Sequence, residues 1–421
     1  MLDLRLIRRD PAAVRAALAR RGDADVGLLD RVLELDVRRR EILPRLEGLR
    51  AEQNAANQAI AAAKKAGESA DDAIAQMRQV AAEAKALDEE LAQVDAELTP
   101  TLAQLPNIPD ESAAPEDTVI KEVGEPWVPS FPVRDHLELA GARIDMERGA
   151  RLSGSRFAYL RGDLARLELA LVSWAIDTLS GHGFEPVIPP VLVREEALYG
   201  TGMLPDTEQQ IYRLADDDLY LAGTSEVALA SLHAGEILDA ESLPLRYAGY
   251  SPCFRREAGA AGKDTRGIFR VHQFDKVEMF SFVEPGQSGD EHERLLAIEE
   301  EILMTLGIPY RVVNIAVDDL GASAAKKYDT EGWLPSQQRY RELTSTSNTT
   351  DFQARRLDIR YRPAGPKAKP ETLHTLNGTA VAVGRTMIAM LENGQQEDGS
   401  VVLPEVLQGY GMPASLPPAG A

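Results

Sequence analysis

The sequence has little cysteine and no long apolar run. Its 421 residues include one cysteine, Cys253, so an internal disulfide and a cysteine-rich zinc site are excluded. No apolar run is long enough to span a bilayer, and the start, MLDLRLIRRDPAAV, lacks the apolar core of a signal peptide. We therefore expect a cytoplasmic protein with no membrane partner.

Positive charge is also scarce. The 46 lysines and arginines face 67 acidic residues, and the net charge of -21 argues against a generally basic nucleic-acid binder. A nucleic-acid partner would have to be contacted through local basic faces. Neither a GxxxxGKS or GxxxxGKT motif nor a Rossmann glycine pattern is present, so a nucleotide would be held in another way.

Apolar residues in the first third of the chain recur in steps of three and four. One series runs from Leu28 to Ala63 and a second from Ala73 to Leu105, with the polar stretch KKAGESADD between them. This spacing predicts an antiparallel helical hairpin with a coiled-coil seam. At ~1.5 Å per residue the first helix would reach about 50 Å, with a local kink at Pro44.

The function of this hairpin has two interpretations. The heptad pattern by itself favours a dimerising coiled coil or a plain spacer. However, the seam turns to alanine towards the tip, where it buries little area, which suits an arm that reaches for a partner. Acidic residues are interleaved with the cations, so a solvated face is the alternative to a binding face. The cations are Arg31, Arg38, Arg39, Arg40, Arg45, Arg50, Lys64, Lys65, Arg78 and Lys85.

A proline-rich connector near residues 105–135 marks a domain boundary. Beyond it, β-type runs such as FEPVIPPVLV, DLYLAGTSE, LRYAGYSPCF and FRVHQFDKVEMFSF alternate with helical stretches such as DEHERLLAIEEEILMTLG. Hairpin-connected strands with helices interspersed predict an α+β fold built on an antiparallel β-sheet flanked by helices. We predict an arm domain at 1–108 and a second domain at 109–421.

The stretch GYSPCFRREAGAAGKDTRGIFRVHQFDKVEMF sets two β-type runs around a glycine-rich loop and loads both with ions. Arg255 and Glu257 share one strand face, as do Phe274, Lys276 and Glu278. A face that mixes aromatic, cationic and anionic groups predicts a binding surface.

Several ordered motifs resemble those of class II aminoacyl-tRNA synthetases. GFEPVIPPVLV resembles motif 1, FRRE at 254–257 resembles motif 2, and LNGTAVAVGRTMIAMLENG resembles motif 3. TSE at 224–226, HQFDKVEMF and ELTSTSNTTDFQARR, together with the N-terminal hairpin, are similar to the bacterial-type seryl-tRNA synthetases. The resemblance covers nearly the whole chain, and it makes the second domain a class II catalytic domain.

The resemblance implies an ATP-dependent ligase that activates L-serine to seryl-adenylate and transfers serine to tRNA(Ser), and also to tRNA(Sec). It implies a homodimer that uses Mg²⁺ and whose arm grips the long variable arm of the tRNA. Local lysine and arginine contacts would then reconcile RNA binding with the acidic composition. The loop AGAAGKDTRG would close over the substrates, since its glycines permit motion.

The resemblance also assigns the ATP site. Arg255 would contact the α-phosphate and the serine carboxylate, and Arg385 the γ-phosphate, because a guanidinium offers paired donors to such oxygens. These two arginines are the catalytic candidates. Glu257 would accept from the adenine amino group, and Phe274 would stack on the ring. The ATP-binding candidates are Arg255, Arg256, Glu257, Val271, Phe274, Glu342, Leu343, Thr344, Ser345 and Arg385.

The resemblance implies that Glu342 and Ser345 are the metal ligands, and their oxygen donors are of the kind that Mg²⁺ favours. The chain departs from the family here. The family commonly has two serines after the glutamate and hydrophobic residue, whereas this chain has Thr344 and Ser345, and Thr346 stands where cysteine is frequent. Both replacements keep a hydroxyl or a small side chain.

Serine recognition requires an acceptor for the ammonium group and a partner for the hydroxyl. The resemblance gives the first role to Glu226 and the second to Glu278, helped by Thr379. An unpaired buried acceptor would reject alanine by ~10⁴-fold, whereas exclusion of threonine depends on steric fit. The serine-binding candidates are Thr224, Ser225, Glu226, Arg255, Glu278, Asn377 and Thr379.

Other interpretations stay open. Glu278 could be an ion-pair partner of Lys276 or Arg270, and Arg385 could cap a structural carboxylate. The whole chain could be a specialised paralogue that supplies seryl-tRNA to a biosynthetic pathway or tolerates a serine-mimicking inhibitor. It could also be a catalytically silent tRNA-binding protein.

Overall fold

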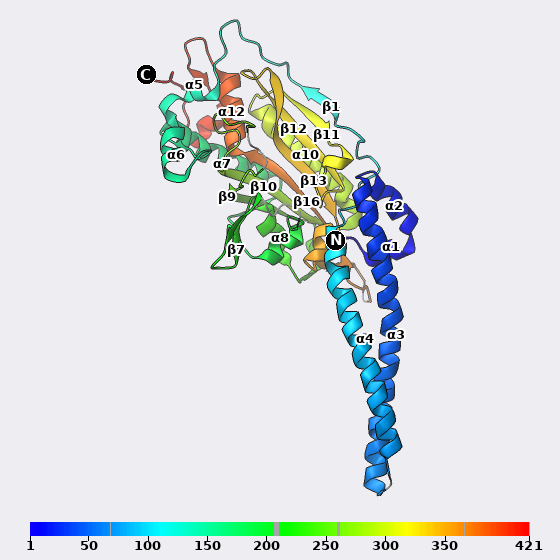
Figure 1. The fold of residues 1–421 in the computed structure, drawn as a ribbon. Helices are drawn as coiled ribbons and strands as arrows, with labels where there is room; N and C mark the ends of the chain where they lie inside the picture. Colours follow the sequence, from blue (N-terminus) through cyan, green and yellow to red (C-terminus); the bar gives the residue numbers. More distant parts are fainter. Residues whose placement is uncertain (68, 206–209, 259–261, 366, 421) are drawn as a thin grey trace. The chain divides into compact units, whose positions relative to one another are not determined.

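The computed structural model describes residues 1–421 except 68, 206–209, 259–261, 366 and 421 (Figure 1). The chain forms two compact units, Leu2–Pro106 and Asn107–Ala421, and Met1 is grouped with the second. None of the helices in the described ranges is long and apolar enough to cross a membrane. Part of the predicted loop AGAAGKDTRG, residues 259–261, lies outside the described residues.

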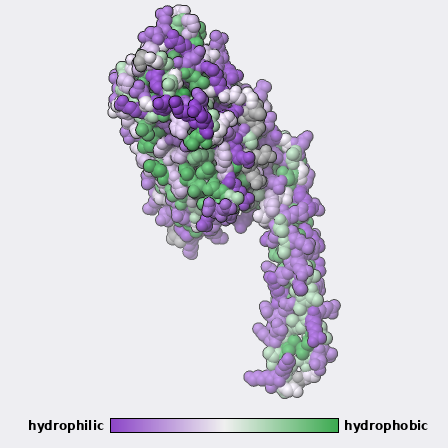
Figure 2. Space-filling view, turned by 60° about the vertical axis from the view of Figure 1, so that its left-hand side comes forward, coloured by the Kyte–Doolittle hydropathy of each residue, from purple (hydrophilic) through white to green (hydrophobic). Residues whose placement is uncertain are grey.

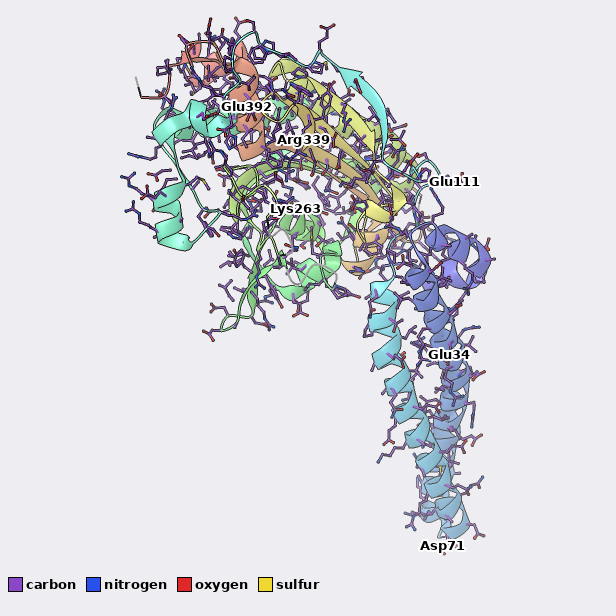
Figure 3. The ribbon with its side chains drawn as sticks, turned by 45° about the horizontal axis from the view of Figure 1, so that its top comes forward. Glu34, Asp71, Glu111, Lys263, Arg339 and Glu392 are labelled. Carbon is purple, nitrogen blue, oxygen red and sulfur yellow. The ribbon has the colours of Figure 1, made fainter. Side chains whose placement is uncertain are left out.

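The first unit is helical throughout. Asp10 caps the second helix by accepting from the backbone N–H of Ala13, and Pro11 stands at the first helical position, where its missing N–H costs nothing. The third helix ends at Gly67, whose φ of 78° is readily adopted only by glycine. Asp71 begins the returning helix at the far end of the hairpin (Figure 3). The helices are α1 (Leu4–Arg9), α2 (Pro11–Ala19), α3 (Asp23–Ala66) and α4 (Asp71–Gln104).

The helices α3 and α4 form the predicted antiparallel hairpin, and Pro44 lies inside α3. Their buried apolar residues recur with the predicted coiled-coil spacing. Within the described part of 47–83 no residue is fully buried, so the seam loses buried area towards the turn, as the alanines predict. The buried seam residues include Val32, Leu35, Ile42 and Leu46 on α3 and Ala84, Leu87, Val94 and Leu98 on α4.

The second unit is built on an eight-stranded sheet, which confirms the predicted α+β class. All neighbouring strands are antiparallel except β4 and β9, which are parallel. The strand order is β1 (Thr118–Val123), β11 (Tyr310–Asn314), β12 (Lys326–Leu334), β13 (Arg339–Thr350), β16 (His374–Ala382), β10 (Gln273–Val283), β9 (Leu245–Phe254) and β4 (Glu185–Val187).

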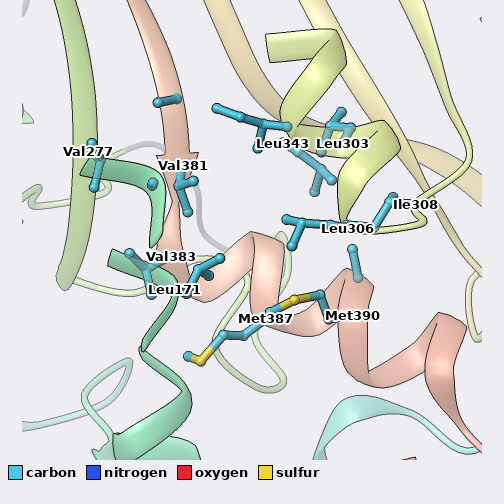
Figure 4. Packing of buried hydrophobic residues seen from close by; sticks show 14 of the residues in the cluster. Leu171, Val277, Leu303, Leu306, Ile308, Leu343, Val381, Val383, Met387 and Met390 are labelled. Carbon is cyan, nitrogen blue, oxygen red and sulfur yellow. The ribbon is translucent and has the colours of Figure 1, made fainter. Parts of the chain in front are cut away.

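Three helices pack against this sheet: α7 (Asp163–Gly181), α10 (Ser288–Thr305) and α12 (Val383–Gly394). Figure 4 shows side chains of α7, β10, β13 and α12, among them Leu171, Val277, Leu343 and Met387, gathered in one apolar cluster. This core holds the central strands in fixed register, and the same strands carry the candidate site.

Shorter elements connect these parts. They are α5 (His136–Ala140), β2 (Ile144–Asp145), α6 (Met146–Ser153), β3 (Tyr159–Leu160), β5 (Leu192–Val193), α8 (Glu195–Thr201), β6 (Tyr212–Leu214), β7 (Leu219–Leu221), α9 (Glu226–Ala230), β8 (Ile237–Asp239), α11 (Phe352–Arg356), β14 (Arg360–Arg362), β15 (Glu371–Thr372), β17 (Val401–Val402) and β18 (Ser415–Leu416).

Two predicted strands are shorter than their apolar runs. In FEPVIPPVLV, pairing stops after Val187, since Pro189 and Pro190 have no N–H to donate, and it resumes at Leu192. In DLYLAGTSE, only Leu219–Leu221 is a strand, and Glu226 begins α9.

Candidate active site

One pocket of about 250 Å³ lies where β10, β13 and β16 meet the start of α12. It brings together most of the residues singled out in the sequence, although they are spread over more than 150 positions. The candidates that line it are Thr224, Glu226, Arg255, Glu257, Val271, Phe274, Glu278, Glu342, Leu343, Thr344, Ser345, Asn377, Thr379 and Arg385.

Two candidates are not among the lining residues. The Ser225 hydroxyl donates to the carbonyl oxygen of Gly249 at 3.4 Å and is buried just before α9. The Arg256 side chain is exposed, while its backbone N–H donates to the carbonyl oxygen of Gln210 at 2.8 Å. Both residues have local bonding that explains their positions without a ligand contact.

Glu278 lines the pocket and is 0% exposed. Its carboxylate pairs with Lys276, two residues earlier on the same strand face, which is one of the partners considered from the sequence. Asn377 donates to one carboxylate oxygen at 3.3 Å, and Thr379 to the other at 3.5 Å. A break in the β10–β16 register beside Val277 sets Thr379 directly opposite Glu278.

Glu226 lies on the same pocket wall, at the start of α9, and is 7% exposed. Its carboxylate accepts from the Gln353 amide at 2.8 Å. Burial, and then the neighbouring charge of Glu278, raise the pKa of Glu226 to about 7, while Lys276, Gln353 and Arg255 act in the opposite direction. The site therefore holds an acceptor that ionises close to neutral pH.

Arg255 directly follows β9, and Phe274 lies on β10, which pairs with β9. The two side chains therefore lie next to each other. The guanidinium carbon of Arg255 is 5.4 Å from the centroid of the Phe274 ring, and its Nε donates to the carbonyl oxygen of Gly223 at 3.2 Å. Glu257 accepts from Arg270 at 2.5 Å. Its φ of 51° is uncommon for a side-chain-bearing residue, and such conformations cluster at functional sites.

A β-bulge on β13 determines where the predicted metal ligands point. The register pairs Thr330 with Thr344 and Glu331 with Glu342, so Leu343 is the extra residue. Residues three apart on a regular strand face opposite sides, but the bulge turns Glu342 and Ser345 to the same pocket.

Arg385, at the start of α12, contacts this strand. Its Nη1 lies 3.2 Å from the Glu342 carboxylate and donates to the Glu342 carbonyl oxygen at 3.1 Å. Burial acts to raise the pKa of Glu342, but Arg385, Lys327 and Arg255 hold it below its usual value. The site therefore keeps Glu342 ionised, and Arg385 pairs with this predicted metal ligand, which lines the pocket.

The donors fit a magnesium ion that is bound together with phosphates. Glu342 offers a carboxylate and Ser345 a hydroxyl. In the described ranges no group of three or more His, Cys, Asp or Glu residues could hold a metal alone. Mg²⁺ is commonly bound by one or two carboxylates plus substrate phosphates and waters, so a pair of oxygen ligands is the expected protein contribution.

Several pocket residues were missed as functional candidates: Phe269, Arg270, Lys276 and Lys327. Lys276 had a signal, because it lies two residues before Glu278 on the same strand face. Lys327 had none, since only the pairing of β12 with β13 brings it to the pocket that Glu342 lines. Gln353 was also missed, although its buried amide bonds Glu226.

The antiparallel sheet, with an arginine after β9, a second at the start of α12 and acceptors between them, defines the class II aminoacyl-tRNA synthetases. The family description "tRNA synthetase class II core domain (G, H, P, S and T)" matches residues 210–394, and "Seryl-tRNA synthetase N-terminal domain" matches residues 1–109. The chain belongs to the seryl-tRNA synthetase family.

Individual relatives agree along the full length. The serine–tRNA ligase of Thermobifida fusca is 51% identical over 418 residues, 97% of each chain, and that of Acidothermus cellulolyticus is 52% identical over 417 residues, 97% of this chain and 98% of the relative. The structure of the Pyrococcus horikoshii seryl-tRNA synthetase complexed with ATP has a TM-score of 0.94 at 41% identity and covers 100% of both chains. The predicted family and the enzyme class of serine–tRNA ligase are confirmed.

Proposed function

We propose that the pocket binds ATP and L-serine, forms seryl-adenylate, and passes serine to tRNA(Ser). In the first step a serine carboxylate oxygen forms a bond to the α-phosphorus of ATP. The bond between the α-phosphorus and the oxygen that bridges to the β-phosphate breaks, and diphosphate leaves. The nucleophile is already ionised, so no general base is needed. One observation carries the proposal: Arg255, Arg385, Glu226 and Glu278 all line one pocket.

The cations serve the phosphates. Arg255 contacts the α-phosphate and the serine carboxylate, two anions that repel each other until a guanidinium lies between them. Arg385 takes the γ-phosphate, and Phe274 and Glu257 take the adenine. Glu342 and Ser345 hold Mg²⁺, which neutralises phosphate charge when bound. The ion pairs Arg385–Glu342 and Arg270–Glu257 support these roles, because they hold the side chains at the pocket wall.

The acceptors serve serine. Glu226, with Thr224, binds the ammonium group, and Glu278 binds the hydroxyl with help from Thr379 and Asn377. Lys276 supports the role of Glu278, since its ammonium group pairs with this carboxylate in the pocket.

ATP–diphosphate exchange with serine, alanine, threonine and cysteine tests this function. Serine is expected to support exchange, and alanine to be poorer by ~10⁴-fold in kcat/KM because it lacks the hydroxyl that Glu278 is proposed to bind. Absence of exchange with serine, combined with retained tRNA binding, would instead support the silent tRNA-binding protein. A specialised paralogue would show serine exchange with an altered response to serine-mimicking inhibitors.

The pH dependence of serine binding tests the role of Glu226. The ionised carboxylate binds the ammonium group, so the serine KM is expected to rise about tenfold per pH unit below the pKa of about 7. Gln353→Leu removes a hydrogen bond that lowers this pKa, so the rise should begin at higher pH while the ATP KM stays constant. Thr375→Val is the control, because the Thr375 hydroxyl bonds the amide oxygen of Gln353 and the Thr349 hydroxyl, whereas the Gln353 amide nitrogen bonds Glu226. An identical pH profile for Gln353→Leu and the wild type would contradict the role.

The tip of the arm supplies the RNA contacts. Most arm cations are paired with acidic residues, as in Arg31–Glu97 and Arg38–Glu90 across the two helices. Towards the turn, the side chains of Lys64, Lys65 and Arg78 have no hydrogen bond or ion pair to any residue that the structure describes. Their charge is available to phosphates, which explains how so acidic a chain binds tRNA.

A second copy of the chain covers an apolar face of the catalytic unit. Figure 2 views the side that carries α6 and α7 and shows hydrophobic residues gathered there. Leu152, Tyr159 and Leu169 are exposed, at 72%, 44% and 63%. An apolar face of this kind supports a homodimer.

The cytoplasm, where ATP and tRNA occur, is the proposed location, and tRNA(Sec) is a second proposed acceptor.

A further inference from the structure

Glu299 is a buried carboxyl group behind the sheet that the proposed reaction does not use. It lies on α10, is 0% exposed, and accepts two hydrogen bonds at one carboxyl oxygen, from the hydroxyls of Thr330 and Thr344, each at 3.0 Å. Its other oxygen is buried and has no hydrogen-bond partner among the described residues. Burial of a carboxyl oxygen without a hydrogen-bond partner lowers the stability of the fold, so the presence of this group calls for an explanation.

The two threonines flank the bulge on β13. Thr330 and Thr344 are paired across β12 and β13, and the next residue on β13 towards Glu342 is the extra one, Leu343. The Leu343 side chain packs over Gly332, where a Cβ atom would lie 2.3 Å from Leu343 Cδ1. Glu299 therefore bonds both residues of the strand pair beside the bulge.

The bulge matters because it sets the direction of two side chains. Glu342 and Ser345 reach the same pocket only because Leu343 adds one residue to β13 between them. Without a fixed bulge, the strand could shift by one residue, and one of the two side chains would turn to the opposite face.

We propose that Glu299 is a positioning residue for the nucleotide site: by bonding Thr330 and Thr344 from α10, it fixes the bulge at Leu343 and thereby aims Glu342 and Ser345 at a magnesium–ATP complex. This inference rests on the proposed metal role of Glu342 and Ser345. The group of β13 that Glu299 holds is the Thr344 hydroxyl.

Variants of Glu299 can separate its role as a hydrogen-bond acceptor from its role in filling space. Burial raises the pKa of this carboxyl well above its usual value. Glu299→Gln keeps an oxygen that accepts from both threonines and has nearly the same shape. Glu299→Met keeps the volume but removes the acceptor. Glu300→Met is the matched control on α10, since Glu300 bonds Tyr310 on β11, away from the bulge.

Calorimetric ATP binding without serine, measured over a range of Mg²⁺ concentrations, tests the inference together with the unfolding midpoint of each free protein. Glu299→Met is expected to raise the Mg²⁺ concentration for half-maximal ATP binding by ~10-fold, in the range found for groups that orient metal ligands. ATP binding without Mg²⁺ should be unchanged, and Glu299→Gln should restore the wild-type value.

The outcomes are separable. If Glu299→Met and Glu300→Met both lower the unfolding midpoint and neither changes the Mg²⁺ requirement, Glu299 is a structural residue only and the inference is wrong. If the wild-type protein binds ATP without any dependence on Mg²⁺, the proposed metal site itself fails, and that result is visible before any variant is made.

Discussion

Arg255→Ala is expected to lower serine-dependent ATP–diphosphate exchange by about 10³-fold in kcat, with a smaller change in the ATP KM. The reason is that negative charge develops on the α-phosphate oxygens as the serine carboxylate approaches, and Arg255 is the proposed cation between the two anions. Arg255→Lys keeps the charge but loses the paired donors, so it should recover only part of the rate. Initial rates of exchange over a range of ATP and serine concentrations measure both parameters.

A surface arginine provides the control for this variant. Arg213 lies on β6, away from the pocket lining, and its side chain pairs with Asp218 at 3.4 Å. Arg213→Ala should leave exchange within about twofold of the wild type, since exposed ion pairs contribute little. Equal exchange rates for Arg255→Ala and Arg213→Ala would remove Arg255 from the reaction.

Deleting the arm is expected to separate the two half-reactions. When residues 30–104 are replaced by a short glycine–serine linker, charging of tRNA(Ser) should fall by at least about 10³-fold, because the proposed phosphate contacts are lost. Exchange with serine should stay within about threefold, since 107–421 forms a compact unit that contains every residue lining the pocket. Aminoacylation and exchange assays on the same preparation make the comparison.

A charge change at the tip refines this test. Lys64→Ala, Lys65→Ala and Arg78→Ala in one protein should weaken tRNA binding and reduce the salt slope of log K by about three units, one for each phosphate contact. Arg45→Ala is the control, because Arg45 is already paired with Glu83 at 3.3 Å. Loss of exchange in the arm deletion, or an unchanged salt slope in the triple variant, would contradict the division of roles.

The elements that could be predicted from the sequence are those that depend on neighbouring residues or on a repeated spacing of apolar residues. The hairpin follows from apolar steps of three and four, and the buried positions Val32, Leu35, Ile42 and Leu46 repeat that spacing in the structure. The antiparallel sheet follows from short β-type runs joined without long crossovers. The motifs that resemble the family then identify residues just after β9 and on β10, β13 and β16 that the folded sheet brings to one pocket.

What the sequence does not predict depends on pairing between distant segments. The bulge at Leu343 exists only in the register of β12 with β13, so no reading of β13 alone shows that Glu342 and Ser345 face one side. Gln353 and Glu299 look like ordinary helix residues until their partners Glu226 and Thr344 are in place. Helical spacing predicts a face for each of them, but not what that face contacts.

A crystal structure with a non-hydrolysable seryl-adenylate analogue, in which a sulfamoyl group replaces the phosphate, tests the proposed site directly. We expect the serine ammonium group on Glu226, the hydroxyl within hydrogen-bond distance of Glu278, the sulfamoyl group on Arg255 and the adenine on Phe274. An analogue bound with its hydroxyl away from Glu278, or with Arg255 still on the Gly223 carbonyl and not on the sulfamoyl group, would contradict it.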